Sequence, residues 1–434
     1  MLKKKIFCSA MLFGMILTLS LTAQDLLDNL HIHGFVSQGY LKSTENNYLT
    51  SDSKDGSMDY NEATINFITT PAKGFHIGTQ LYARDLDLDG NLVVTIDWAY
   101  GDYRWKDYLG IRVGRFKNPL GLYSKVRDVD MARVPIFLPQ SVYGESERDM
   151  NLGINGVGLY GNRPVSFLGD FDYEVVYGGY NLLDVHSAFF TNQYRLTGEG
   201  LAAGMTMDPS VQSATLAGTS EEVSRIRNVR GFKITWNTPV SGLLVGYSGN
   251  QLEFGWDLKA NVDMVVLTGD PSNPYYPMSQ SVPITGDYEI TTKNAFTEFQ
   301  WNKLTLAGEY RQFDIVGDVI LGTIQSHTDE PREMYYGMGS YQLNNRLAFS
   351  AYYSVFYQNS DDKEGKLKVA AGEPAFTGWQ KDLCFTGRLD VTNNWLIKVE
   401  YHKINGTGQV YGMHNPDGLK EDWSMIAVKN TFHF

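Results

Sequence analysis

The final segment of the chain, residues 423–434, alternates apolar and polar residues up to the last position. Phe434, Phe432, Val428 and Ile426 fall on one face of a β-strand, because successive side chains of a strand point to opposite sides. His433, Thr431 and Lys429 fall on the other face. An apolar stripe that reaches the chain end is unusual in a soluble protein. It is typical of a transmembrane β-barrel, in which the last strand closes against the first and its outer face meets lipid.

Residues 1–23 have the pattern of a secretory signal peptide. Lysines at positions 3–5 form the charged start, an apolar stretch follows from Ile6 to Leu21, and the polar Gln24 comes after short residues. A membrane anchor is the alternative, but the apolar stretch is shorter than the ~20 residues of a spanning helix. We therefore expect export, removal of residues 1–23, and one outer-membrane barrel over residues 24–434.

The charge balance and the cysteine content exclude several classes of function. The formal net charge is −12, and removal of the three N-terminal lysines makes it −15. This acidity argues against nucleic acid as a partner, because nucleic-acid-binding proteins carry basic surfaces. Only Cys384 remains after removal of residues 1–23, so we expect neither an intramolecular disulfide nor a cysteine metal cluster.

Runs with a period of two recur along the chain. Even positions from Leu92 to Tyr100 are apolar, and a similar stripe starts at Trp395. We expect these apolar faces to meet lipid. Short turns are predicted at residues 70–74, 105–108, 238–242, 301–303, 343–346 and 392–395, and long polar loops near 43–57, 118–150, 181–225, 267–290, 316–331, 359–378 and 405–420. Short periplasmic turns that alternate with long extracellular loops are typical of an outer-membrane barrel.

The strand count depends on residues 242–267, which can be one strand or two with a break at 248–250. Bacterial single-chain barrels have even strand numbers, so we treat this segment as one irregular strand. The prediction is an all-β, antiparallel transmembrane barrel of 16 strands, with 18 as the alternative. A soluble β-sandwich or β-helix is the other fold considered, but it needs neither a signal peptide nor lipid-facing stripes.

The long loop at residues 118–150 follows a strand that is rich in bases. Between residues 112 and 133 the sequence holds six bases and two acids: Arg112, Arg115, Lys117, Lys125, Arg127, Arg133, Asp128 and Asp130. Facing charges in a narrow throat of low dielectric select ions. We hypothesise that these bases line a constriction with the two aspartates opposite. The alternatives are salt bridges that hold the loop to the barrel wall, or binding of lipopolysaccharide phosphates outside.

The predicted signal peptide, the sixteen-strand pattern and the terminal Phe434 with Phe432 resemble Gram-negative outer-membrane porins. The stretch Asp97-Trp-Ala-Tyr-Gly-Asp-Tyr-Arg104, followed by Gly110-Ile-Arg-Val-Gly-Arg-Phe-Lys-Asn-Pro-Leu-Gly121, is similar to the phosphate-selective-porin-like branch. No extended lysine cluster supports phosphate selectivity. The resemblance implies a loop that folds into the lumen, recognition by the barrel-assembly machinery, contact with outer-membrane lipid and lipopolysaccharide, and a homotrimer.

The function expected is passive diffusion of small hydrophilic solutes or ions across the outer membrane. Bases at the narrowest point would give a weak anion preference, because the field there is least screened. A structural or adhesin barrel is one alternative and an outer-membrane enzyme is another. We predict no catalytic, metal-binding or cofactor-binding residues. The eight histidines are dispersed, and His31 and His33, which share a strand face, lack a third ligand nearby.

Overall fold

A computed structural model describes residues 29–86, 92–145, 148, 153–181, 188–270, 272, 274–321 and 324–434. The predicted signal peptide, residues 1–23, lies outside these ranges, so its removal stays a prediction. Among the described residues, no helix combines the length and the apolar character needed to cross a membrane.

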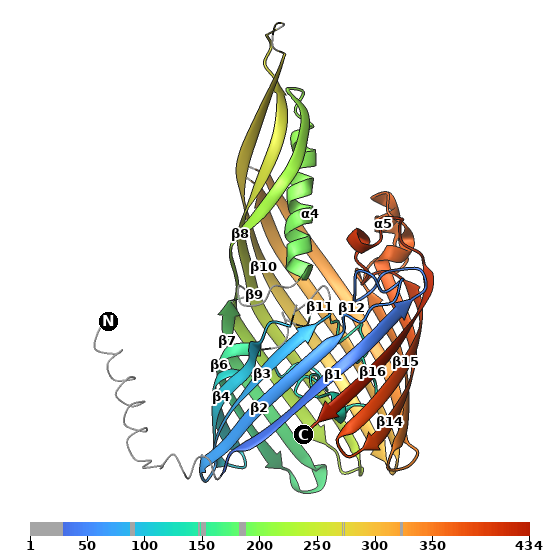
Figure 1. Cartoon of the computed structure of the whole chain (residues 1–434). Coiled ribbons are helices and arrows are strands. Elements are labelled where there is room, and N and C mark those ends of the chain that lie inside the picture. The colour runs from blue at the N-terminus through green and yellow to red at the C-terminus, as the bar shows by residue number, and fades with distance from the viewer. Residues whose placement is uncertain are drawn as a thin grey trace, which may run out of the picture.

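The described residues form sixteen antiparallel strands in a closed barrel, as predicted (Figure 1). Each strand pairs with its neighbours in sequence, and β1 pairs with β16 to close the ring. The strands are β1 (His31–Ser43), β2 (Asn61–Ala72), β3 (Phe75–Asp85), β4 (Thr95–Lys106), β5 (Leu109–Lys117), β6 (Gly153–Pro164), β7 (Asp170–Asn181), β8 (Val211–Asn237), β9 (Leu243–Leu267), β10 (Tyr275–Trp301), β11 (Leu304–Leu321), β12 (Ile324–Gln342), β13 (Leu347–Tyr357), β14 (Trp379–Thr392), β15 (Trp395–Gly406) and β16 (Asp422–His433). The segment at 242–267 is the single strand β9, which confirms sixteen over eighteen.

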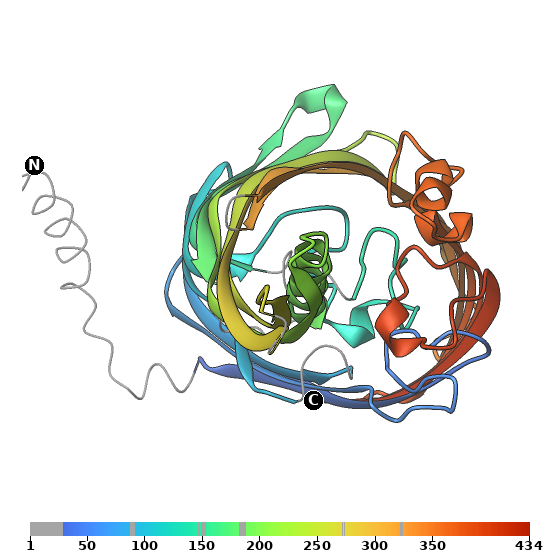
Figure 2. The ribbon, with the colours of Figure 1, turned by 90° about the horizontal axis from the view of Figure 1, so that it is seen from above.

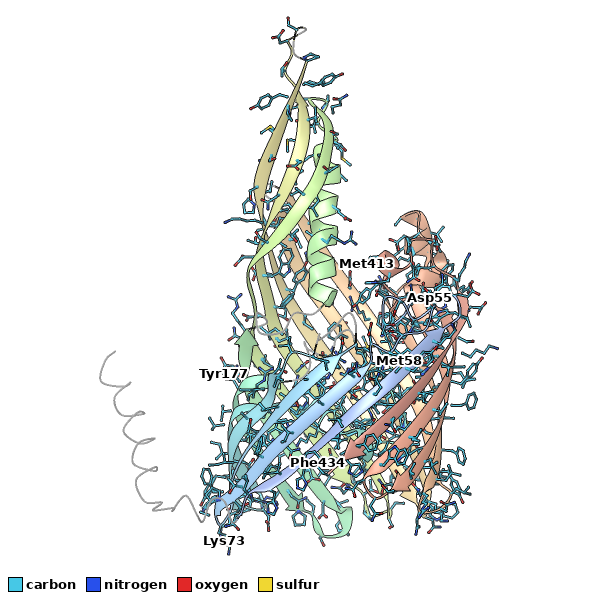
Figure 3. The ribbon with its side chains drawn as sticks, in the orientation of Figure 1. Asp55, Met58, Lys73, Tyr177, Met413 and Phe434 are labelled. Carbon is cyan, nitrogen blue, oxygen red and sulfur yellow. The ribbon has the colours of Figure 1, made fainter. Side chains whose placement is uncertain are left out.

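The closing pair β1–β16 has the alternation that the C-terminal sequence predicts. Val36 pairs with Phe432, and these side chains are 52 % and 47 % exposed on the outer surface. Lys429 and Thr431 are fully buried on the inner side. Figure 3 shows Phe434 at the end of β16. The apolar outer face is therefore a real feature of this strand, whereas its inner face is polar at Lys429 and Thr431 and apolar from Trp423 to Ala427.

The barrel has one end with short turns and one end with long connections. The short turns fall at the six predicted places, and a seventh, between β6 and β7, carries the 3-10 helix η2 (Ser166–Leu168). Figure 3 shows Lys73 at the short-turn end and Asp55 at the opposite, long-loop end. The long connections include α5 (Lys366–Ala370), η4 (Ala375–Gly378) and η5 (Gly412–His414).

Three of the predicted long loops are largely secondary structure instead. Residues 181–225 contain the helix α4 (Ala188–Met205) and the start of β8, residues 267–290 are mostly β10, and residues 316–331 form the β11–β12 hairpin. These strands extend beyond the barrel, and α4 packs against β8 and β9 (Figure 1). The extension of β9 keeps the period of two, because the buried Leu258, Ala260, Val262 and Met264 alternate with polar residues.

Strand β4 contains a β-bulge that changes which residues face the lumen. Gln80 of β3 pairs with Trp98, but the next residue, Leu81, pairs with Ile96, so Asp97 has no residue opposite. Ile96 is exposed on the outer surface, whereas Trp98 and Tyr100 line a cavity in the lumen. The prediction that the apolar stripe of residues 92–100 faces lipid throughout is therefore wrong beyond the bulge.

Candidate functional site

The connection between β5 and β6 folds into the barrel (Figure 2). We call residues 118–145, which include the 3-10 helix η1 (Asp130–Ala132), the inserted loop. Ile136, Phe137 and Leu138 are at most 1 % exposed, because they pack inside the ring of strands. Residues 146–150 of the predicted loop lie outside the described ranges except Arg148. The inserted loop is the largest feature of the lumen that the structure describes.

The first anchor of the inserted loop is Asp130, which faces β15 and β16. Lys398 Nζ lies 2.9 Å from Asp130 Oδ1, and Lys429 Nζ lies 3.3 Å from the same oxygen. Thr431 donates a hydrogen bond of 2.7 Å to Oδ2. Lys429 also forms an ion pair with Glu62 of β2. Both lysines are fully buried, so this anchor is a dry, completely paired group of charges.

A second anchor holds the tip of the inserted loop against β14 and β15. The main-chain N–H groups of Ile136 and Phe137 donate to the two carboxylate oxygens of Glu400, at 2.6 and 3.2 Å. Arg388 donates to the main-chain oxygens of Met131 and Arg133, at 2.7 and 3.0 Å. Glu400 and Arg388 of the barrel wall therefore supply hydrogen-bond partners for main-chain N–H and C=O groups of the loop. Without such partners, burial of these groups would be costly.

A third anchor lies at β9 and β11. Glu309 accepts hydrogen bonds from the Tyr143 hydroxyl at 2.5 Å and from the Leu122 N–H at 3.0 Å. Arg311 donates to the Val142 oxygen at 2.6 Å, and Ser248 Oγ accepts from the Gly121 N–H at 2.9 Å. Because β11 and β16 lie on different parts of the ring, the inserted loop reaches across the lumen.

The beginning and end of the inserted loop are joined by further ion pairs. Arg84 of β3 pairs with Glu145, and Arg127 lies 3.5 Å from the same carboxylate. Arg127 also donates to the main-chain oxygens of Tyr143 and Gly144. Arg127 therefore connects the first half of the inserted loop to its last residues. Arg84 connects the end of the loop to the barrel wall at β3.

The two aspartates of the loop are held in the charged state. Burial alone would raise the pKa of Asp128, but Arg148 and Lys117 outweigh it and hold this pKa well below its ordinary value. Burial opposes ionisation of Asp130 too, yet Lys398 and Lys429 hold its pKa far below the ordinary value. Both carboxylates therefore stay ionised at neutral pH.

Two cavities lie on the opposite side of the inserted loop, along the inner face of β2 to β8. One has a volume of about 230 Å³ and the other about 320 Å³, and Lys125 contributes to both. We call the two cavities together the passage. The first is lined by Asn66, Gln80, Trp98, Tyr100, Arg112, Lys117, Lys125, Asp128 and Val129. The second is lined by Arg104, Lys125, Tyr160, Gly161, Asn162, Asp172, Tyr173, Glu174, Lys233 and Thr235.

Several charges of the passage are paired, and the acids of these pairs are buried while some of the bases keep exposed surface. Arg112 Nε lies 2.9 Å from Asp102 Oδ2, and Arg112 also lies 3.4 Å from Glu174. Lys125 pairs with the same Glu174, yet its side chain is 52 % exposed. Lys117 bridges Asp97, at 2.8 Å, and Asp128. An ion that enters the passage would contact the exposed ammonium group of Lys125, and the rings of Trp98 and Tyr100 line the same cavity.

The structure divides the predicted site residues into three groups. Four line the passage: Arg112, Lys117, Lys125 and Asp128. Three face the interior of the loop or the opposite wall: Arg127, Asp130 and Arg133. Arg115 pairs with Asn155 in register and shares the outer face with exposed Val113, and its Nε donates to the Asp97 main-chain oxygen. Whether the first group selects ions stays a prediction.

Several residues of the passage are not in the predicted set. Strand parity does predict that Glu174 and Lys233 point into the lumen, although the predicted constriction set does not include them. Parity does not predict this for Trp98 and Tyr100, because the bulge at Asp97 that turns them inward leaves no mark in the alternation. The β14–β16 partners of the loop are equally invisible, because they lie more than 250 positions away in sequence.

No family model matches the chain, and no curated protein matches it either. Similar solved structures include OmpF of Salmonella typhi in complex with daunomycin, which is 13 % identical over 95 % of this chain and 99 % of its own, with a TM-score of 0.54. An anion-selective porin from Comamonas acidovorans is 10 % identical over 93 % of this chain and 99 % of its own, with a TM-score of 0.48. The outer-membrane channel DcaP of Acinetobacter baumannii is 12 % identical over 93 % and 97 %, with a TM-score of 0.47.

Identities this low carry information about the fold alone. The similarity to OmpF extends over nearly the full length of both chains, so this protein has a porin-like barrel fold. The residues that line the passage have to be interpreted from their own chemistry.

Proposed function

We propose that this protein is an outer-membrane porin that allows passive diffusion of small hydrophilic solutes or ions. The observation that carries the proposal is the polar passage beside the inserted loop, within a closed barrel whose outer face is apolar. A barrel of sixteen strands is too wide for its wall side chains to fill. The inserted loop narrows that lumen, and the passage is the space that the loop leaves on the β2–β8 side.

The charges of the passage support a weak anion preference. Five bases and three acids line it among the described residues: Arg104, Arg112, Lys117, Lys125 and Lys233, with Asp128, Asp172 and Glu174. Asp102 and Asp97 lie behind this lining and pair with Arg112 and Lys117, so the excess of bases is confined to the surface that an ion would contact. The bases include Lys125, which is half exposed. In a narrow, poorly screened passage, a small excess of positive charge favours anions. The bases are not arranged as a lysine ladder, which argues against a channel dedicated to phosphate.

Location and partners follow from the same proposal. Residues 1–23 would direct export, the barrel-assembly machinery would insert the barrel, and the outer surface would contact lipid and lipopolysaccharide. The short turns would then lie in the periplasm and the long connections outside the cell. A homotrimer is proposed from the resemblance to porins only.

Electrophysiology of the purified protein tests the proposal. Protein extracted from outer membranes should give steady open steps in planar bilayers, and liposomes that contain it should admit small sugars but exclude larger ones. Under a KCl gradient, the reversal potential should show a weak preference for chloride. A closed barrel that acts as an enzyme or as a purely structural protein would give no conductance steps, which would contradict the proposal.

A second candidate, an adhesin barrel, is favoured by the extension of β8, β9 and β10 beyond the barrel (Figure 1). This extension exposes Tyr275, Tyr276 and Met278. The test is a variant that lacks residues 261–281, the outer part of the β9–β10 hairpin, because its removal leaves the pair Ala260–Val282 and the barrel wall in place. Loss of surface attachment by cells with this variant, with unchanged conductance of the purified barrel, would show that adhesion is a separate activity of the extension.

A further inference from the structure

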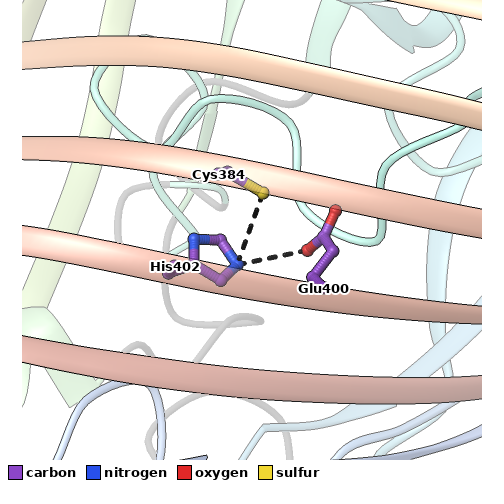
Figure 4. Close-up of side chains that lie close together, drawn as sticks. All are labelled: Cys384, Glu400 and His402. Carbon is purple, nitrogen blue, oxygen red and sulfur yellow. Dashed lines mark hydrogen bonds and ion pairs between the residues drawn. The ribbon is translucent and has the colours of Figure 1, made fainter.

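We propose that Cys384, Glu400 and His402 form a binding site for a divalent transition-metal ion, with Zn²⁺ as the ion that fits best. The three side chains project from β14 and β15 into the space behind the inserted loop (Figure 4). Their ligand atoms all lie within 4.8 Å of one another. This site departs from our sequence prediction that the protein has no metal ligands.

Two of the distances between the ligand atoms are close to those of a tetrahedral zinc site. His402 Nε2 lies 3.3 Å from Glu400 Oε2 and 3.8 Å from Cys384 Sγ. Bonds of ~2.0–2.3 Å from zinc to nitrogen, oxygen and sulfur put neighbouring tetrahedral ligands about 3.3–3.7 Å apart. At 3.8 Å a thiol forms at best a weak hydrogen bond with imidazole, so hydrogen bonding alone explains this spacing poorly.

The surroundings of the three ligands also resemble those of metal sites. Asp382 Oδ2 lies 2.9 Å from His402 Nδ1, on the side of the ring away from Cys384 and Glu400. A carboxylate in this position fixes the imidazole so that Nε2 is available to a metal ion. Thr386 Oγ1 donates to Glu400 Oε1 at 2.8 Å, which orients the second carboxylate ligand. His402 therefore contacts Asp382 through Nδ1 and would bind the metal ion through Nε2.

The choice of zinc follows from the ligand types and the burial. Thiolate, imidazole and carboxylate together suit Zn²⁺, whereas Mg²⁺ and Ca²⁺ prefer oxygen ligands. Cys384, Glu400 and His402 are at most 1 % exposed, and the rings of Phe137 and Tyr352 lie beside His402. A closed site of this kind is suited to a structural ion, with a water molecule in the fourth position.

The consequence for the fold is a metal-dependent attachment of the inserted loop. Glu400 is the residue whose two oxygens accept the N–H groups of Ile136 and Phe137 at the tip of the loop. A metal ion on Glu400 and His402 would fix the acceptor to which the loop tip is bound. The ion would thereby stabilise the loop against the β14–β15 wall.

Metal analysis of the full-length protein from outer membranes tests the site directly. The protein should be purified without a histidine tag or chelator and then unfolded in guanidinium in the presence of a zinc-sensitive dye. About one zinc ion per chain should be released, and only on unfolding. Protein refolded with Co²⁺ should show a cobalt–thiolate charge-transfer band, which a site without a sulfur ligand does not give.

Three variants and a matched control separate the metal site from a hydrogen-bonded cluster. Cys384→Ser, His402→Gln and Glu400→Gln should each retain less than about a tenth of the zinc, and Cys384→Ser should lack the cobalt band. The control is His327→Gln, because His327 also pairs with a carboxylate, Asp318 at 3.0 Å, but has neither the cysteine nor the glutamate. This variant should keep its zinc. Absence of zinc and of the cobalt band from the unmodified protein, or retention of zinc in Cys384→Ser and His402→Gln, would overturn the proposal.

Discussion

The two sides of the inserted loop use the same residue types for different purposes. Toward β14–β16, Lys398, Lys429 and Asp130 are at most 1 % exposed, and every one of them contacts the loop or the wall. Toward β2–β8, Lys125 and Arg112 pair with Glu174 at the edge of the passage and keep exposed surface. We call the first side the anchored side and the second the open side.

The difference shows that charge pairs alone do not identify a pore lining. On the anchored side Lys398 also donates to the main-chain oxygens of Asp130 and Pro135 in the loop. Burying a charge costs free energy unless the charge is paired. Movement of the loop would separate these buried pairs, so the pairs hold the loop in one position. On the open side, the exposed parts of the Lys125 and Arg112 side chains can interact with a passing ion.

The largest expected effect is that of deleting residues 123–139, which removes the anchored side and much of the loop. Single-channel conductance should roughly double or more, because conductance follows the cross-section of the narrowest part. The solute cut-off in liposome swelling should rise too. A deletion of similar size in the β8–β10 extension serves as the control. Unchanged conductance in the loop deletion would show that the loop does not set the narrowest point.

A single substitution, Asp130→Asn, tests the anchored side without shortening the chain. It leaves Lys398 and Lys429 buried without their shared carboxylate, which should lower the free energy of unfolding by about 3–5 kcal/mol. Denaturant unfolding followed by the loss of the folded band on gels would measure the change. Asp329→Asn, at an exposed position, is the control and should have no effect. Equal stabilities of the two variants would show that the anchor contributes little.

The pH dependence of the inserted loop follows from the lowered pKa values of Asp130 on the anchored side and Asp128 on the open side. A carboxylate whose pKa is lower in the folded state than in the unfolded state stabilises the fold fully above the unfolded pKa, about 4. That stability is lost as the pH falls through the lowered folded values. The channel steps should therefore be the same at pH 7 and pH 5, and the stability should fall only below about pH 4. A stability midpoint near pH 6 would point to a different titrating group.

The smallest expected effect is on ion selectivity at the open side. Lys125→Gln should lower the chloride-to-potassium permeability ratio by less than about twofold, because a half-exposed charge is screened by salt. Reversal potentials under a KCl gradient measure it. Lys73→Gln, at the exposed short-turn end, should leave the ratio unchanged. If both variants give the same ratio as the parent, Lys125 does not contribute to selectivity.

Particular residues show how far the sequence predicts the site. Lys117 and Asp128 were expected at a constriction, and they do meet at the edge of the passage. Asp130 was expected opposite the bases but instead pairs with Lys398 of β15 and Lys429 of β16. Arg115 falls on the outer face, since the alternation of β5 assigns it to the side of Val113.

The sequence by itself determined the barrel, its strand number and the apolar outer face, because these depend on the period-two alternation within each strand and on the spacing of the turns. The tertiary structure decided which charges anchor the inserted loop and which line the passage. Glu400, for example, meets Ile136 across 264 positions of sequence. The bulge at Asp97 likewise turned Trp98 and Tyr100 inward. Pairing between distant strands and a loop is set by the closure of the ring, and no local pattern encodes it.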